Sequence, residues 1–179
     1  VYVQDLSLLD EKQAAALRAQ GRFLVAQIGS GPPPPEVVKR YDFAVTSFPH
    51  YVERFRALGV DTEYFGIAFY DRVLDKLRSE GALHEPGNER SHDAVFVGTV
   101  HPKHVHAQGT ELLERIASEA DVEFWGQIAE DLELGSPILA RHRGEAWGLD
   151  MYKVLADARI SVNRHGDLAE SNANNMRLY

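Results

Sequence analysis

Residues 93–100 read DAVFVGTV, and this nearly continuous apolar run constrains the fold more than any other feature of the chain. Such a run is typical of a parallel strand that is buried on both faces of a sheet. Parallel strands are joined by long crossover connections, which are usually helices. The run therefore predicts an α/β protein with a mainly parallel sheet covered by helices.

The rest of the chain alternates between strand and helix patterns. Short β-branched or apolar runs predict strands at 1–3, 23–28, 43–48, 60–68, 122–125 and 160–163. Apolar residues at helical spacing predict helices between these strands, for example over 49–58, 112–120 and 147–158. Residues 127–145 are expected to be mostly loop, and a final helix is expected from residue 172. This order predicts strands connected by right-handed helical crossovers.

Composition excludes several function classes. The chain of 179 residues has a net charge of −8, which does not attract nucleic acid or an anionic membrane surface. No apolar run approaches the roughly 18 residues of a membrane-spanning helix, so no integral membrane segment is expected. Because the chain has no cysteine, disulfides, thiolate zinc sites and thiol catalysis are excluded. These features predict a cytoplasmic protein.

The two ends of the chain lie inside predicted elements. Val1 begins in a strand pattern and Tyr179 ends in a helix pattern. We therefore expect the chain to be a piece of a longer protein. If it is complete, the exposed sheet edges predict a partner chain or an oligomer that covers them.

Ligands of open parallel sheets bind beyond the carboxyl ends of the strands. Glycines stand there after two predicted strands, at Gly98 and Gly126, and would let a ligand approach the backbone. Basic groups near these strand ends make the local charge positive in an otherwise acidic protein, as a diphosphate site needs. They are Lys103, Arg164, His165 and Arg177. Each glycine alone is as often a simple turn residue. Neither the GxGxxG fingerprint nor the P-loop motif is present.

Several histidines invite a catalytic or metal-binding interpretation. His101, His104 and His106 follow one strand, but they lack the helical spacing of a zinc pair, so no metal site is predicted. The alternative is a polar loop beside the ligand pocket. His50 is a weak candidate for a catalytic base, and its alternative role is a polar residue at the start of a helix.

Three stretches resemble a known family of enzymes. They lie at 41–69 (YDFAVTSFPHYVERFRALGVDTEYFGIAF), 93–104 (DAVFVGTVHPKH) and 151–179 (MYKVLADARISVNRHGDLAESNANNMRLY). Together they resemble, in the same order, the group-1-like glycosyltransferases of the spore-maturation, CgeB-like type. The third stretch, with its Asn-x-Arg-aromatic pattern at 175–179, is the most specific.

The resemblance implies a GT-B fold, in which two Rossmann-like domains face each other across a cleft. Residues 1–70 would be the C-terminal half of the acceptor-side domain, and 71–92 would be a linker. Residues 93–179 would be the N-terminal half of the domain that binds the nucleotide sugar. The predicted fold is therefore two Rossmann-like parallel-sheet halves joined by a linker.

The resemblance also implies the activity and the site. A hexosyltransferase-like enzyme would move a sugar from a nucleotide-diphosphate sugar to an unknown acceptor, without a metal or another cofactor. The residues expected to line the donor are Gly98, Lys103, Gly126, His165, Asn175 and Arg177. The chain departs from the family twice: it stops before the glutamate that usually follows Tyr179, and it has Gln108 and Gly109 where the family commonly has an arginine. A noncatalytic nucleotide-binding domain and a sugar-nucleotide epimerase with the same two-domain plan remain alternatives.

Overall fold

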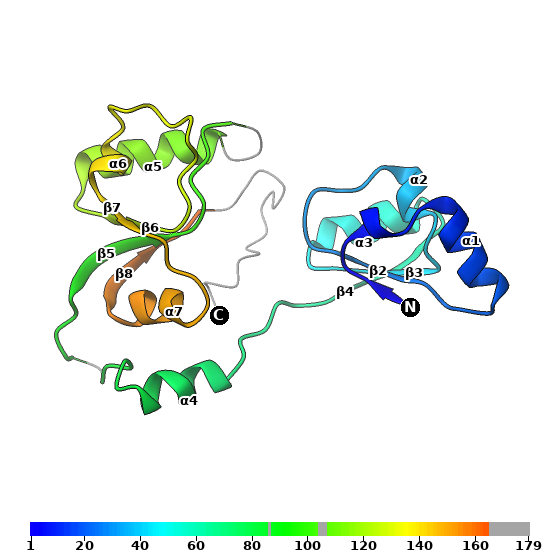
Figure 1. Cartoon of the computed structure of the whole chain (residues 1–179), viewed down its shortest axis with the longest axis horizontal. Coiled ribbons are helices and arrows are strands. Elements are labelled where there is room, and N and C mark those ends of the chain that lie inside the picture. Colours follow the sequence, from blue (N-terminus) through cyan, green and yellow to red (C-terminus); the bar gives the residue numbers. More distant parts are fainter. Residues whose placement is uncertain (86, 104–106, 165–179) are drawn as a thin grey trace. The chain divides into compact units, whose positions relative to one another are not determined.

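A computed structural model describes residues 1–85, 87–103 and 107–164 of the chain (Figure 1). Among these residues, Val1–Ala68 form one compact unit and 69–164 belong to a second. In the described part of each unit, four parallel strands form a sheet that is flanked by helices. The predicted α/β class with two Rossmann-like parallel-sheet halves is therefore confirmed.

The first unit places its strands in the order of the sequence, β1-β2-β3-β4. Its elements are β1 (Tyr2–Val3), a short 3₁₀ helix η1 (Leu6–Leu8), α1 (Glu11–Ala19), β2 (Val25–Ile28), α2 (Pro35–Val38), β3 (Phe43–Thr46), α3 (Pro49–Arg56) and β4 (Asp61–Tyr64). Because each strand lies beside the preceding one, right-handed crossovers bring α1, α2 and α3 to the same face of the sheet (Figure 1). Strand β4 ends at Tyr64, so the strand predicted over 60–68 is wrong in its last four residues.

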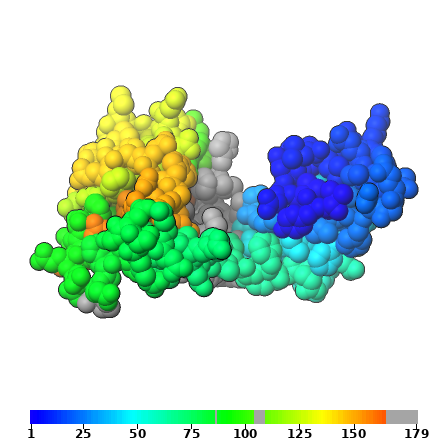
Figure 2. All heavy atoms as spheres, turned by 60° about the horizontal axis from the view of Figure 1, so that its bottom comes forward, coloured from blue at the N-terminus to red at the C-terminus, as the bar shows by residue number. Residues whose placement is uncertain are grey.

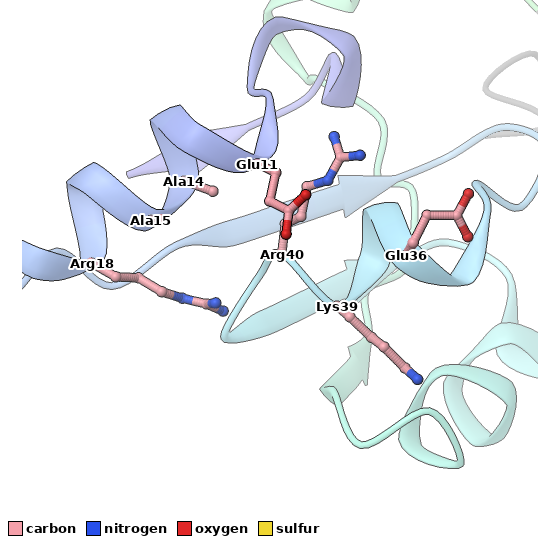
Figure 3. Close-up of a pocket in the computed structure, with 7 residues that line it drawn as sticks. All are labelled: Glu11, Ala14, Ala15, Arg18, Glu36, Lys39 and Arg40. Atoms are coloured by element: carbon pink, nitrogen blue, oxygen red, sulfur yellow. The ribbon is translucent and has the colours of Figure 1, made fainter.

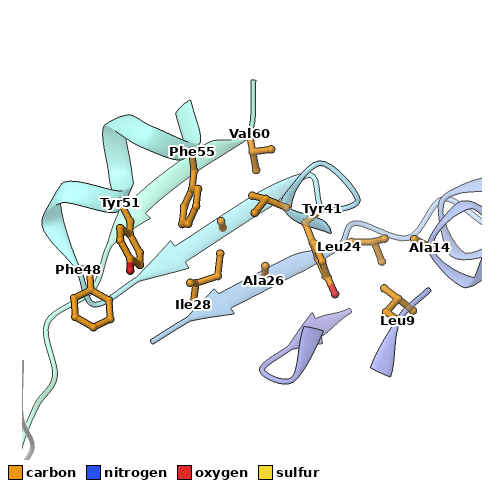
Figure 4. Close-up of a cluster of buried hydrophobic side chains, with 12 residues drawn as sticks. Leu9, Ala14, Leu24, Ala26, Ile28, Tyr41, Phe48, Tyr51, Phe55 and Val60 are labelled. Atoms are coloured by element: carbon orange, nitrogen blue, oxygen red, sulfur yellow. The ribbon is translucent and has the colours of Figure 1, made fainter. Parts of the chain in front are cut away.

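The core of the first unit lies between this face of the sheet and the helices (Figure 4). Along β2 and β3 every second side chain is buried, including Ala26, Ile28 and Ala44, as expected for strands with a period of two. Helix α3 places the rings of Tyr51 and Phe55 over these strands, with 5.4 Å between the ring centroids. Small strand residues and large helix residues thus share the core.

The second unit has a different strand order, β7-β6-β5-β8. Its elements are α4 (Arg72–Ser79), β5 (His92–Val97), α5 (Ala107–Glu119), β6 (Glu123–Trp125), α6 (Pro137–Ala140), β7 (His142–Gly144), α7 (Leu149–Ala156) and β8 (Ala158–Val162). Helices α5 and α6 cover one face of the sheet and α7 covers the other (Figure 1). This is a doubly wound arrangement.

Strand β5 contributes to a core on each side of this sheet. Phe96 packs in the cluster that contains Leu113 of α5. Val95 and Val97 pack in the opposite cluster, which contains Val154 of α7. All three residues of β5 are at most 2% exposed. The prediction of a strand buried on both faces is confirmed for these three residues, but the strand ends at Val97, three residues before the predicted end at 100.

The prediction that residues 127–145 are mostly loop is wrong in part, because the segment contains α6 and β7. Helix α6 is a single turn that begins at Pro137, where the Ser136 hydroxyl accepts a hydrogen bond from the Ile138 amide at 3.3 Å. Strand β7 is the tripeptide His-Arg-Gly at the edge of the described sheet. It has no apolar alternation because its backbone pairing with β6, rather than side-chain burial, holds it in place.

The segment 71–92, predicted as a linker, begins with α4, which packs against α7 of the second unit. The residues after α4 are bonded to the end of α7. Asp157 accepts a hydrogen bond from the Ser91 amide at 3.0 Å, and its carboxylate lies 3.0 Å from Nε2 of His84. Arg90 donates to the Ala156 carbonyl oxygen at 2.9 Å. The segment therefore joins the second unit through a small polar network.

We expect Asp157→Ala to lower the free energy of unfolding by about 1–2 kcal/mol, because hydrogen bonds to a charged group are lost. Burial raises the pKa of Asp157, but the hydrogen bonds from Ser91 and the charges of His84 and His92 together hold the pKa below its usual 3.8. A depressed pKa stabilises the fold above the unfolded value and loses that contribution as pH falls through the folded value. Urea denaturation of wild type and Asp157→Ala at pH 6 and below pH 3.8 tests this. A difference between the two proteins that does not shrink at low pH would contradict it.

No helix in the described residues is long and apolar enough to cross a membrane.

Candidate functional site

The strand order of the second sheet creates a switch point beside β5. From β5 the chain winds outward through β6 to β7, and then returns to place β8 on the other side of β5. In such sheets the connections on either side of this point leave opposite faces, and a crevice opens beyond the carboxyl ends of the two strands. Here those ends are followed by Gly98 and Thr99 after β5, and by Asn163 and Arg164 after β8. We call the region beyond these two strand ends the crevice and take it as the candidate site.

Arg164 lies against the first turn of α5. Its Nη2 donates a hydrogen bond to the Thr99 carbonyl oxygen at 3.1 Å. A Cβ atom added to Gly109 would lie 2.4 Å from Nη1 and 2.7 Å from Cδ of Arg164. The guanidinium group therefore occupies the space that any side chain at position 109 would need. A side chain at position 109 would therefore displace the end of the Arg164 side chain from the helix.

This placement concentrates positive charge in the crevice. The N-terminal end of a helix carries a partial positive charge, and a guanidinium group beside it adds to that positive polarity. Arg164 is partly buried and sits at the end of α5 that already has this polarity. An anion placed between the guanidinium and the helix end would be stabilised by both. The arrangement is suited to a phosphate or diphosphate group.

Gly98 and Gly126, both predicted as donor-binding residues, lie next to each other. Gly126 has a φ of +109°, and a Cβ atom added there would lie 2.4 Å from the Gly98 carbonyl oxygen. The Gly98 amide donates to the Trp125 carbonyl oxygen at 2.9 Å, and the Gly126 amide donates to that of Gly144 at 2.9 Å. Backbone packing between the ends of β5 and β6 is thus enough to explain why position 126 is a glycine. Contact of either glycine with a donor stays a prediction.

Lys103, a third predicted donor-binding residue, is engaged in an ion pair. Its ammonium nitrogen lies 2.5 Å from the Asp131 carboxylate. The hydrogen bond from Lys103 lowers the pKa of Asp131 below its usual value. Any diphosphate that binds Lys103 therefore has to compete with Asp131.

His101 is held within the loop that follows β5. Its Nδ1 accepts a hydrogen bond from the Lys103 amide at 3.1 Å, and its carbonyl oxygen accepts one from the Thr110 hydroxyl at 2.7 Å. Among the described residues, no three His, Asp or Glu side chains lie close enough together to hold a metal ion. His104 and His106 lie outside the described residues.

His50, the weak candidate for a catalytic base, lies in the first unit. It follows Pro49 in the first turn of α3, and its ring is half-buried. The centroid of this ring lies 4.5 Å from the ring centroid of Tyr51 and 5.6 Å from the ring centroid of Phe48. His50 therefore lies where its alternative role would put it, as a polar residue at the start of a helix. Its catalytic role stays a prediction.

Three further predicted donor-binding residues, His165, Asn175 and Arg177, lie outside the described residues. In contrast, the structure brings Arg164, Thr99 and Gly109 together, although the sequence indicated only that Arg164 was a basic residue after a strand. Their contact depends on the pairing of β8 with β5, which joins segments 65 residues apart. No local sequence pattern specifies that contact.

The first unit contains a pocket of about 370 Å³ between α1 and α2 (Figure 3), lined by Glu11, Ala14, Ala15, Arg18, Glu36, Lys39 and Arg40. Two of its cations already have partners. Arg18 lies 2.8 Å from the carboxylate of Asp42, and Arg40 donates to the Leu9 carbonyl oxygen at 3.2 Å. With two glutamates also on its walls, the pocket has mixed charge. The crevice at the ends of β5 and β8 therefore remains the stronger candidate.

The chain was also compared with known proteins. No protein-family model matches it, and no curated protein sequence matches it.

Proposed function

We propose that the chain belongs to a glycosyltransferase and that the crevice beyond β5 and β8 binds the diphosphate of a nucleotide-sugar donor. One observation carries the proposal: the Arg164 guanidinium group lies against the first turn of α5 at the switch point of a doubly wound sheet. The resemblance of residues 41–69, 93–104 and 151–179 to group-1-like glycosyltransferases supports the sugar-transfer chemistry.

In the proposed reaction, the bond between the anomeric carbon of the sugar and the diphosphate oxygen breaks, and an acceptor hydroxyl forms the new bond. Negative charge grows on the leaving diphosphate as its bond to the sugar breaks. In this proposal Arg164 and the N-terminal end of α5 stabilise that charge, which is electrostatic catalysis by preorganised groups. The proton of the acceptor hydroxyl is taken up by the leaving diphosphate or by solvent in the same process.

Two other functions use the same crevice. A noncatalytic nucleotide-binding domain would bind the nucleoside diphosphate but would release no sugar. A sugar-nucleotide epimerase would hydrolyse or epimerise the donor without an acceptor. Incubation with UDP-, GDP- and dTDP-sugars, followed by chromatography of the products with and without candidate acceptors, separates these functions from transfer.

We expect Arg164→Ala to weaken binding of the preferred nucleoside diphosphate by about tenfold or more, as for loss of a charge-assisted hydrogen bond. Thermal shift with UDP, GDP and dTDP identifies the preferred nucleotide, because a ligand that binds the folded form raises the apparent stability. Titration calorimetry then measures the affinity of the variant.

Arg159→Ala is the matched control for this experiment. Arg159 lies near the beginning of β8, away from the carboxyl end of the strand, and its guanidinium group donates to Asp93 at 3.2 Å. Arg159→Ala is expected to keep the affinity of the wild type. Equal affinities of wild type and Arg164→Ala, or no binding of any of the three nucleotides, would refute the proposed site.

A further inference from the structure

Helix α4 lies beside α7, on the face of the second sheet that α7 covers (Figures 1 and 2). A second concave surface of this unit is lined by residues at the start of each helix. We call it the α4–α7 groove. It has a volume of about 290 Å³ and is lined by Tyr70, Arg72, Val73, Lys76, Leu149 and Tyr152, with the Gly148 backbone at one end. The proposed diphosphate crevice uses none of these residues.

The walls of the α4–α7 groove are apolar. Tyr70 is 63% exposed, and the side chains of Val73, Leu149 and Tyr152 are half-buried. The ring of Tyr152 is held edge-on by Phe69, with 5.8 Å between the ring centroids. A planar apolar group in the groove would remove this surface from water and could pack against two tyrosine rings.

The charged side chains that line the groove, Arg72 and Lys76, are both basic. They stand four residues apart on α4 and therefore lie on the same side of that helix. The guanidinium carbon of Arg72 lies 6.0 Å from the centroid of the Tyr70 ring. This is a local reversal of sign, because the chain has 27 acidic residues and 19 lysines and arginines.

The carboxylate nearest to Lys76 does not cancel this charge. Glu80 lies 2.9 Å from the Lys76 ammonium group and 2.7 Å from that of Lys153. Hydrogen bonds from Lys153 and then from Lys76 lower the pKa of Glu80 to about 2, so it is ionised at neutral pH. Lys153 also lies 3.8 Å from the Asp150 carboxylate. Arg72, Lys76 and Lys153 thus carry three positive charges against the two carboxylates of Glu80 and Asp150, so this group of five side chains keeps one net positive charge.

The N-terminal end of α7 adds further positive polarity at the groove. Gly148 precedes the helix, no side chain caps this end, and Asp150 is the acidic residue of its first turn. Helix α7 has eight residues, enough for a helix dipole to favour an anion at its start. The apolar walls, the basic pair and the helix start therefore meet in one surface.

We propose that the α4–α7 groove is a binding site for a small aromatic phosphate monoester. The ring lies between Tyr70 and Tyr152, and the phosphate is bound by Arg72 and Lys76. Two cations one helical turn apart can both bind a phosphate dianion, which carries more charge and more acceptor oxygens than a carboxylate. The site is independent of the proposed donor crevice, since the two share no residue.

Titration calorimetry of the full chain with phenyl phosphate tests this proposal. We expect binding with a Kd of about 1 mM or tighter. Phenol, which lacks the anion, and inorganic phosphate, which lacks the ring, are each expected to bind about tenfold more weakly or worse. Equal binding of phosphate and phenyl phosphate, or no binding of phenyl phosphate, would overturn the proposal.

Variants locate the bound phenyl phosphate. Arg72→Ala and Tyr70→Ala, both at exposed positions, are expected to weaken its binding by about fivefold or more. Arg78→Ala is the matched control, because Arg78 lies on the same helix, pairs with Asp75 at 3.1 Å and does not line the groove. It is expected to bind phenyl phosphate as the wild type does. A loss in Arg78→Ala equal to that in Arg72→Ala would indicate general charge attraction and overturn the site.

Arg164→Ala separates this site from the donor crevice. It is expected to lose nucleoside diphosphate binding and to keep phenyl phosphate binding. If Arg164→Ala loses phenyl phosphate as well, the probe binds in the donor crevice and the α4–α7 groove is not the site. Competition with UMP adds a second check: displacement of phenyl phosphate by UMP in Arg164→Ala would mean that the groove accepts nucleotides among aromatic phosphates.

Discussion

Gly126→Ala is expected to destabilise the protein by about 4 kcal/mol, the sum of backbone strain and overpacking. Gly126 has a φ of +109°, a region that residues with a Cβ atom rarely adopt. The added Cβ would also lie 2.4 Å from the Gly98 carbonyl oxygen. Because this neighbour is backbone in a strand end, it cannot move aside as a side chain would. Urea denaturation followed by tryptophan fluorescence measures the effect, since both tryptophans, Trp125 and Trp147, lie in the second unit.

Gly144→Ala separates strain from steric contact. Gly144 lies at the end of the neighbouring strand β7 and has a φ of +112°, but no atom lies within 4 Å of its added Cβ. Gly144→Ala is expected to lower the free energy of unfolding by about 2 kcal/mol, which is the effect of backbone strain alone. The difference between the two variants measures the contact of Gly126 with Gly98. If both variants lose the same stability, the close packing of the β5 and β6 ends does not contribute.

Phe55→Ala is expected to lower the free energy of unfolding by about 3–5 kcal/mol, as for other large-to-small changes in a core. Phe55 is 1% exposed and packs within the core of the first unit, between α3 and the sheet. Its removal leaves a cavity beside Tyr51, whose ring centroid lies 5.4 Å away. Urea denaturation followed by circular dichroism reports the loss of helix and strand.

Phe23→Ala is the matched control in the same unit. Phe23 is 59% exposed, so its truncation is expected to change stability by no more than about 0.5 kcal/mol. A large loss in Phe23→Ala would mean that this ring is covered in solution by something other than the described residues. A small loss in Phe55→Ala would mean that the core around α3 closes over the cavity.

The strands with strong patterns could be predicted from sequence because each carries its own burial signal. The apolar run that became β5 is buried on both faces, and the β2 and β3 patterns match their alternating burial. Strand β7 carried no such signal, because three residues at a sheet edge are held by backbone pairing. Short-range patterns report which side chains are buried and say little about edge strands.

The candidate site could be predicted only in part. The sequence marked Gly98 and Gly126 as glycines after strands, and they do lie together, but their contact is explained by backbone packing. It marked Lys103 as a phosphate ligand without showing its pairing with Asp131. It did not indicate that Arg164 fills the space above Gly109. Each of these contacts joins residues far apart in the chain.

The sequence by itself determined the α/β class and the burial of the central strands, because hydrophobic periodicity is a local property of the chain. Only the tertiary structure decided the strand orders, β1-β2-β3-β4 in one unit and β7-β6-β5-β8 in the other. The return of β8 to the side of β5 brings Arg164 to the first turn of α5. That pairing results from packing of α7 and β8 against the whole sheet, an interaction summed over many residues that no single motif contains.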